Sequence, residues 1–157
     1  MDRREFLETQ QKQHAAWEKL LGEIKPADML TPGVVGEWSV KDLIAHVTWY
    51  EREMLPVLAQ RALVGSELWD EPLDVRNQTI YEQNKDRTLD EVLEDSRQVY
   101  AALWNELQTL SDEDLIDPGR FKEWPPEWPP WELLASNTFQ HYEEHIPELQ
   151  VWVETHS

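Results

Sequence analysis

The residues best suited to chemistry are two histidines near the C-terminal end, His141 and His145. The surrounding pattern is helical, and positions four apart share one face of a helix, so both imidazoles can reach one point. At roughly 100° per residue they fall within an arc of about 80° that also contains Leu134, Thr138, Leu149 and Trp152. Imidazoles on an apolar face need partners, since an unpaired buried polar group costs about 1–3 kcal/mol. A metal ion is the partner that would use both rings.

A third candidate ligand is His46. A second helix is predicted from Ser39, a natural N-cap, to about Val64, and His46 lies at one edge of its apolar face. Three histidines from two helices form a three-nitrogen site with open positions for water or substrate, as in catalytic zinc sites. Imidazole ligands also suit nickel, iron and copper, so the pattern does not specify the metal. The alternative is that the histidines are satisfied by hydrogen bonds within the core.

Other polar residues are weaker candidates. Glu53 lies one heptad after the first of these histidines, where it is placed to accept a hydrogen bond from a ligand or to act as a catalytic base. A solvated glutamate is the ordinary alternative at that position. Glu143 and Glu144 point away from the histidine face by helical geometry. Asn77 and Tyr81 are placed to supply polar groups to the mouth of a pocket, or to serve in turns and caps.

Long helical segments are predicted to carry these residues. Residues 3–24 form the first, and His14 on its flank is expected to be partly buried with a local partner. The second covers residues 39–64, and Pro56 is predicted to kink it or break it. The third begins at a capping box headed by Thr88 and continues as a clean apolar stripe.

The fourth helix is predicted to begin at Pro130, a residue favoured at the first helical position. Pro147 predicts a kink just after His145, because proline removes a helical hydrogen bond. Between the second and third helices, residues 65–73 are irregular and residues 77–84 have a short helical pattern. Strand-like alternation is absent throughout. We therefore predict an all-α fold, a four-helix bundle with a long crossover between its second and third helices.

Composition bounds the partners. The chain has 157 residues, which suits one domain over residues 1–157. Its net charge of −18 disfavours nucleic acid and anionic membrane surfaces as partners. The absence of cysteine excludes disulfides and thiolate ligands and fits a cytoplasmic protein. No apolar run approaches the roughly 20 residues that span a bilayer, and the N-terminus lacks a signal-peptide core. A small molecule is the partner we expect.

Residues 124–131 alternate tryptophan with paired prolines, in the order Trp124-Pro-Pro-Glu-Trp-Pro-Pro-Trp131. Such a segment forms neither helix nor central strand, so a rigid extended loop is predicted. Its indoles either cover the end of the core or form an aromatic wall beside a pocket.

Three stretches resemble the DinB/YfiT-like superfamily. Residues 36–46, G-E-W-S-V-K-D-L-I-A-H, are similar to the G-x-W-S-x-x-D-x-x-x-H opening of that family's second helix. Residues 137–145 resemble its H-x-x-x-H segment in helix four. Residues 77–84, N-x-x-I-Y-x-x-N before a capped helix, are similar to the ClbS/DfsB-like branch. The resemblance covers essentially the whole chain.

This resemblance implies a divalent metal, commonly nickel or zinc, held by His46, His141 and His145, and frequent homodimers. Members include transferases and isomerases that use low-molecular-weight thiols, and a hydrolase that opens a cyclopropane in a genotoxin. We therefore expect a metal-dependent hydrolase or thiol S-transferase that acts on an electrophilic small molecule. The alternative is a non-catalytic small-molecule-binding protein, or a metal-free ClbS-like protective protein.

Overall fold

The regular elements of the protein are helices throughout the described part of the chain, residues 1–156 of the computed structural model. The long helices are α1 (Arg3–Gly22), α2 (Val40–Gln60), α4 (Leu89–Leu107) and α7 (Phe139–Thr155). Between them lie α3 (Leu73–Asn84), α5 (Asp112–Ile116) and α6 (Pro130–Ser136), with short 3₁₀ turns at Pro26–Met29, Glu67–Asp70 and Pro118–Arg120. The predicted all-α fold class is confirmed.

Side-chain caps begin α1, α2 and α4, as the sequence predicts. At α2 the Asp42 amide donates to Ser39 Oγ (3.2 Å) and the Ser39 amide donates to Asp42 Oδ2 (2.9 Å), a complete capping box. Asp2 and Thr88 cap α1 and α4 by the first of these two bonds, since their side chains accept from the amides of Glu5 and Glu91. These caps satisfy amides that have no partner within the helix. They also determine which residues of each helix face the interior.

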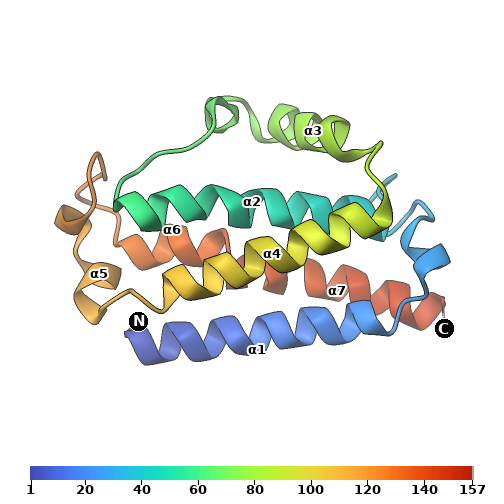
Figure 1. Ribbon diagram of the computed structural model, residues 1–157, viewed down its shortest axis with the longest axis horizontal. Coiled ribbons are helices and arrows are strands. Elements are labelled where there is room, and N and C mark those ends of the chain that lie inside the picture. Colours follow the sequence, from blue (N-terminus) through green and yellow to red (C-terminus); the bar gives the residue numbers. More distant parts are fainter. Residues whose placement is uncertain (157) are drawn as a thin grey trace.

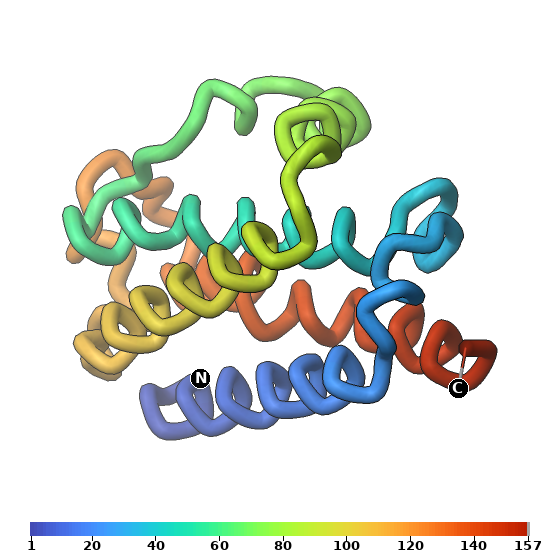
Figure 2. Tube along the Cα trace, turned by 45° about the vertical axis from the view of Figure 1, so that its right-hand side comes forward, coloured from blue at the N-terminus to red at the C-terminus, as the bar shows by residue number. Residues whose placement is uncertain are grey.

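The long helices form a bundle in which α2 packs along α4 and α1 packs along α7. The colour gradient in Figure 1 shows that α2 and α4 run in the same direction. The connection between them must therefore return along the outside of the bundle, and it carries α3 with it (Figures 1 and 2). Ile80 of α3 is buried against Trp49 and Tyr50 of α2. This returning segment covers one face of α2.

The predicted end of the second helix is wrong. The second helix ends at Gln60, not near Val64, because Arg61 adopts a left-handed conformation with φ 48° and ψ 57°. A residue in that conformation ends an α-helix. Pro56 lies inside α2 without interrupting it.

The predicted fourth helix is divided before the histidines. Its two parts, α6 and α7, are separated at Asn137 and Thr138, and α7 continues as helix past Pro147. Thr138 Oγ1 donates to the Leu134 carbonyl (2.6 Å) and Asn137 Nδ2 donates to the Leu133 carbonyl (3.0 Å). Such side chains compete with the backbone ladder, which explains why the interruption falls there.

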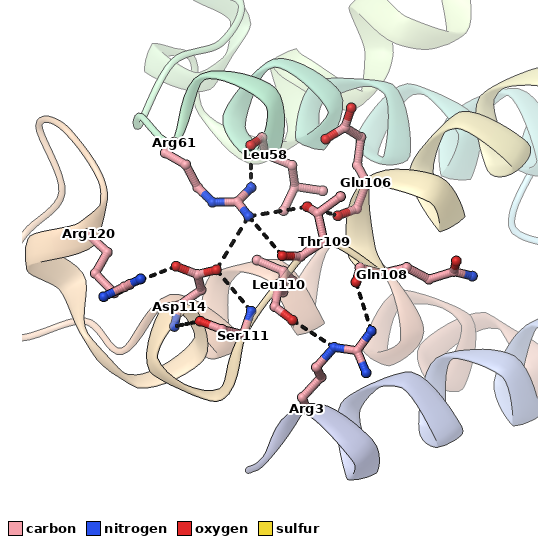
Figure 3. Close-up of polar contacts among 10 residues, drawn as sticks. All are labelled: Arg3, Leu58, Arg61, Glu106, Gln108, Thr109, Leu110, Ser111, Asp114 and Arg120. Carbon is pink, nitrogen blue, oxygen red and sulfur yellow. Dashed lines mark hydrogen bonds and ion pairs between the residues drawn. The ribbon is translucent and has the colours of Figure 1, made fainter.

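A polar cluster closes one end of the bundle. We name it the Asp114 cluster, and Figure 3 shows its central residues, Arg3, Arg61, Ser111, Asp114 and Arg120. Asp114 accepts hydrogen bonds from Arg120 Nε (2.8 Å), from the Ser111 amide (2.9 Å) and from Arg61 Nη2 (3.4 Å). Arg3 donates to the carbonyls of Gln108 and Leu110, each at 2.8 Å. The cluster ties the end of α4 and α5 to α1 and α2.

Candidate metal centre

The three predicted histidine ligands meet in one place. His46 comes from α2, His141 and His145 come from α7, and all three are buried. One ligand nitrogen from each ring lies within 4.8 Å of the other two. The closest pair is His46 Nε2 and His141 Nε2, 3.1 Å apart. Metal–imidazole bonds of about 2.0–2.1 Å can span such a pair.

The electrostatics of the pocket keep two of the rings neutral. Burial, followed by the charges of His145 and Arg76, lowers the pKa of His46 to about 3. Burial, followed by His46 and His145, lowers the pKa of His141 to about 2. A neutral imidazole has a free lone pair, the form that binds a metal.

Glu148 orients the third ring. His145 Nδ1 lies 3.2 Å from Glu148 Oε1, three residues along α7. A proton on Nδ1 directs the lone pair to Nε2, which is buried and has no hydrogen-bond partner among the described residues. A carboxylate behind a histidine is a frequent arrangement at metal sites because it fixes the tautomer and raises basicity. The donor set therefore fits a divalent metal ion.

The histidines face an open cavity of about 330 Å³. Its aromatic walls are Trp38, Tyr50 and Trp69, and Ser136 and Asn137 at the break between α6 and α7 line it beside the histidines. Tyr50 is in edge contact with both His46 (5.0 Å between ring centroids) and His141 (4.8 Å). The walls leave space for a ligand next to the three nitrogens.

The returning connection supplies the remaining polar groups of the cavity. Tyr50 donates its hydroxyl hydrogen to Asn77 Oδ1 (2.7 Å) and accepts a hydrogen bond from Arg76 Nε (3.1 Å). Asn77 therefore lies in the pocket, one of the two roles considered for it. Tyr81 instead stacks parallel to Trp38 at 6.4 Å, behind the pocket wall.

The structure does not bring Glu53 into the metal centre. Its Oε1 accepts hydrogen bonds from the Ser66 amide (2.6 Å) and from Trp69 Nε1 (2.7 Å). Throughout residues 1–156 it forms no hydrogen bond with a histidine. Through these two hydrogen bonds, Glu53 holds the segment between α2 and α3 against α2. Glu144, predicted to point away, lines the cavity at an exposed position.

His14 lies elsewhere, in agreement with the local role expected for it. Its ring stacks on Tyr100 with centroids 3.3 Å apart, and its Nε2 lies 3.4 Å from Glu18 Oε1. It contributes nothing to the histidine cavity.

A second cavity of about 440 Å³ adjoins the first. Trp69 and Asn137 line both, and the second is otherwise mainly apolar, with Met54, Val57 and Leu133 among its walls. The tryptophan–proline loop, residues 124–131, both covers the core and forms part of a pocket wall, the two roles considered for it. Trp124 is buried in the core, while Trp128 is 48% exposed and lines the second cavity.

Sequence reasoning missed Arg76, Tyr50 and Glu148. A signal existed for two of them, since Tyr50 follows His46 by four residues and Glu148 follows His145 by three, both spacings that place side chains together on a helix. Arg76 had no such signal, because only the path of the connection brings it to the cavity.

Three buried histidines around an open cavity are an arrangement with which helical bundles can hold a metal between helices. The chain belongs to the DinB superfamily, whose family model matches residues 6–149. This range contains all three histidines, and the resemblance seen in the sequence motifs is confirmed. The sequence matches none of the curated proteins.

Solved structures share the fold over nearly the whole chain. The colibactin self-resistance protein ClbS in complex with double-stranded DNA has 18% sequence identity and a TM-score of 0.78, with 95% of this chain and 93% of ClbS covered. DfsB, described as a sibling lethal factor precursor, has 20% identity and a TM-score of 0.76, with 99% and 96% covered. An uncharacterised protein from Escherichia coli UTI89 has 18% identity and a TM-score of 0.79, with 98% and 94% covered.

The ClbS complex bears on the partner prediction. A protein of the same fold was solved with DNA, which weighs against excluding nucleic acid from acidic charge alone. Within the described residues, no helix combines the length and apolar character needed to cross a membrane.

Proposed function

We propose that this protein is a divalent-metal enzyme, a hydrolase or thiol S-transferase, that acts on an electrophilic small molecule. The observation that carries the proposal is the convergence of His46, His141 and His145 at a cavity of about 330 Å³. The open side of the three nitrogens faces space for a substrate, which distinguishes a catalytic arrangement from a closed structural one. Nickel and zinc both suit three imidazoles.

A bound metal of this kind acts as a Lewis acid toward water or a thiolate. The chain's own residues bind it and shape the space around it. Glu148 holds the tautomer of His145, while Tyr50 packs against His46 and His141 and limits how their rings can turn. Trp38 and Trp69 exclude water from the cavity walls, which strengthens electrostatic interactions within it.

Elemental analysis of purified protein tests the metal centre. Wild type is expected to retain nickel or zinc, and His141→Ala is expected to lose it while the matched control His14→Gln keeps it. A thermal melt with and without a chelator gives a second measurement. Metal at a hundredfold excess over Kd stabilises the folded state by about 2.7 kcal/mol, so the chelator should lower the Tm. Equal and negligible metal in all three proteins would refute the centre.

The catalytic part of the proposal has its own test. Metal-loaded wild type is incubated with styrene oxide, an electrophile, with and without glutathione, and its consumption is followed by chromatography. Hydrolysis without thiol supports the hydrolase, and thiol-dependent consumption supports the transferase. Either activity should disappear in His141→Ala and remain in His14→Gln.

The second cavity favours one alternative, a metal-free small-molecule-binding protein. Trp128 and Leu133 line an apolar space of about 440 Å³, a size that suits a small ligand. Quenching of tryptophan fluorescence separates the two functions. A response to Ni²⁺ that needs His46 and His145 favours the enzyme, whereas a response only to apolar ligands favours the binding protein.

A further inference from the structure

Arg76 differs from the other arginines of this chain. Each of the other seven side chains donates to a carboxylate or to a backbone carbonyl; they are Arg3, Arg4, Arg52, Arg61, Arg87, Arg97 and Arg120. Within residues 1–156, Arg76 forms no ion pair, and its one side-chain hydrogen bond goes from Nε to the Tyr50 hydroxyl (3.1 Å). This occurs in a chain with 32 acidic residues against 14 basic ones. Among the arginines, Arg76 is therefore the one whose side chain donates to neither a carboxylate nor a backbone carbonyl within the described residues.

Aromatic rings hold Arg76 in place. Its guanidinium carbon lies 4.8 Å from the ring centre of Trp69 and 5.8 Å from that of Tyr50. Such contacts attract a cation through the ring face but leave the guanidinium N–H groups in its plane free to donate. Trp69 is itself fixed by Glu53, and Tyr50 by Asn77. The side chain is thus positioned by neighbours that leave its two Nη groups available.

The position of Arg76 connects it to the histidines. It lines the same cavity as His46, His141 and His145. Glu144 is the one carboxylate that lines this cavity, and it forms no ion pair with Arg76 in the described chain. The free Nη groups therefore belong to a side chain that lines the cavity onto which the three histidines face.

We propose that Arg76 binds the carboxylate of a small-molecule ligand whose reactive part lies at the histidines. A guanidinium donates two parallel hydrogen bonds to a carboxylate, a geometry that an ammonium group cannot match. The proposal deepens the function proposed above and rests on it for the presence of a ligand in this cavity. It makes Arg76 a binding residue that selects acidic substrates or acidic thiols over neutral ones.

A matched pair of probes tests the proposal. Binding of 3-phenylpropanoate and of its neutral amide is measured by calorimetry at low salt, with protein freed of metal so that the carboxylate cannot bind a metal instead. Wild type should bind the carboxylate about tenfold or more tightly than the amide, since hydrogen bonds to charged groups are worth about 1.5–3 kcal/mol. Arg76→Gln should bind both probes equally, with amide affinity unchanged. The preference of Arg76→Lys for the carboxylate should lie between those of wild type and Arg76→Gln, because lysine keeps the charge but cannot donate two parallel hydrogen bonds.

Arg97→Gln is the control, since it removes the same charge from a surface ion pair with Glu94. It should keep the wild-type preference. Equal affinities in wild type, failure of wild type to bind the carboxylate, or a preference retained by Arg76→Gln would each overturn the proposal. Loss of the carboxylate preference only in the Arg76 variants supports the Arg76 proposal, even if elemental analysis finds no metal. Failure of the Arg76 proposal can therefore be distinguished from failure of the proposed metal centre.

The same comparison identifies the source of the carboxylate. A second pair, 3-mercaptopropanoate and its amide, is titrated beside the phenyl pair into zinc-loaded wild type and zinc-loaded Arg76→Gln, so that both pairs are compared in the same metal state. A larger Arg76 effect for the thiol pair assigns the carboxylate to a thiol co-substrate. A larger effect for the phenyl pair assigns it to the electrophile.

Discussion

The Asp114 cluster and the histidine cavity are both polar regions built from several helices, yet their hydrogen bonding differs. At Asp114 the carboxylate accepts from two arginines and a backbone amide, and Arg3 and Arg61 also donate to carbonyls (Figure 3). In the cavity, buried atoms of all three histidines have no partner among the described residues, and Arg76 has free donors. Buried polar groups are normally paired, so the cavity is the region that awaits a ligand.

Unpaired atoms alone do not define such a site. Both side-chain polar atoms of Gln10 are buried without a partner, and Glu51 is buried with one partner, the Tyr142 hydroxyl at 2.9 Å. Neither residue lines either of the cavities described above. What distinguishes the histidine region is the combination of unpaired buried nitrogens, His145 Nε2 among them, with an open space. The following four changes test that distinction, in order of decreasing effect.

Replacing His141 by alanine should lower metal affinity by more than about 100-fold, beyond the 10- to 100-fold usual for residues that only support a ligand. Competition with a chelating dye measures the affinity. The free energy of unfolding of the metal-free protein should change by much less than the free energy of metal binding. An unchanged affinity would show that the cavity is merely another satisfied polar region.

Replacing Asp114 by asparagine should destabilise the fold by about 2–3 kcal/mol, because it weakens a helix cap and charged hydrogen bonds together. Urea unfolding measures the loss, and Glu113→Gln, a neighbouring exposed change, is the control. Metal affinity should be unaltered. A change in metal binding without loss of stability would contradict a structural role for the cluster.

Glu51 should make stability depend on pH. Burial raises its pKa to about 8, opposed by its hydrogen bond with Tyr142. Because this folded-state pKa exceeds the unfolded one, the stabilisation is complete below the unfolded pKa near 4.5 and is lost as pH rises through about 8. At about 1.4 kcal/mol per pH unit, wild type should lose roughly 2 kcal/mol relative to Glu51→Gln between pH 6 and pH 7.5. Parallel pH profiles for the two proteins would contradict it.

Replacing Glu148 by glutamine should weaken metal binding about tenfold, since an amide orients the His145 ring but supports its basicity less than a carboxylate. The dye competition assay again gives the affinity, with Glu143→Gln on the exposed side of the same helix as control. Identical affinities in both variants would limit Glu148 to a structural contact.

Local patterns made much of the fold predictable. Apolar periodicity located the long helices, and Ser39, Thr88 and Asp2 marked their beginnings because capping depends on residues within one turn. The same logic placed His141 and His145 on one face and His46 on the inner side of α2. It failed at Asn137 and Thr138, where side-chain hydrogen bonds to the preceding turn outcompete the helix.

The sequence by itself determined the helical class, the caps and the face on which each histidine lies, since these depend on spacing along one helix. The irregular residues after the second helix predicted a long crossover, but only the tertiary structure decided that the connection 61–88 lies against α2 and which of its side chains reach the cavity. It engages Glu53 with Trp69 and brings Arg76 beside the histidines. The three candidate ligand histidines were therefore predictable from the sequence, whereas the position of Arg76 in their cavity depends on contacts between segments that are distant in the chain.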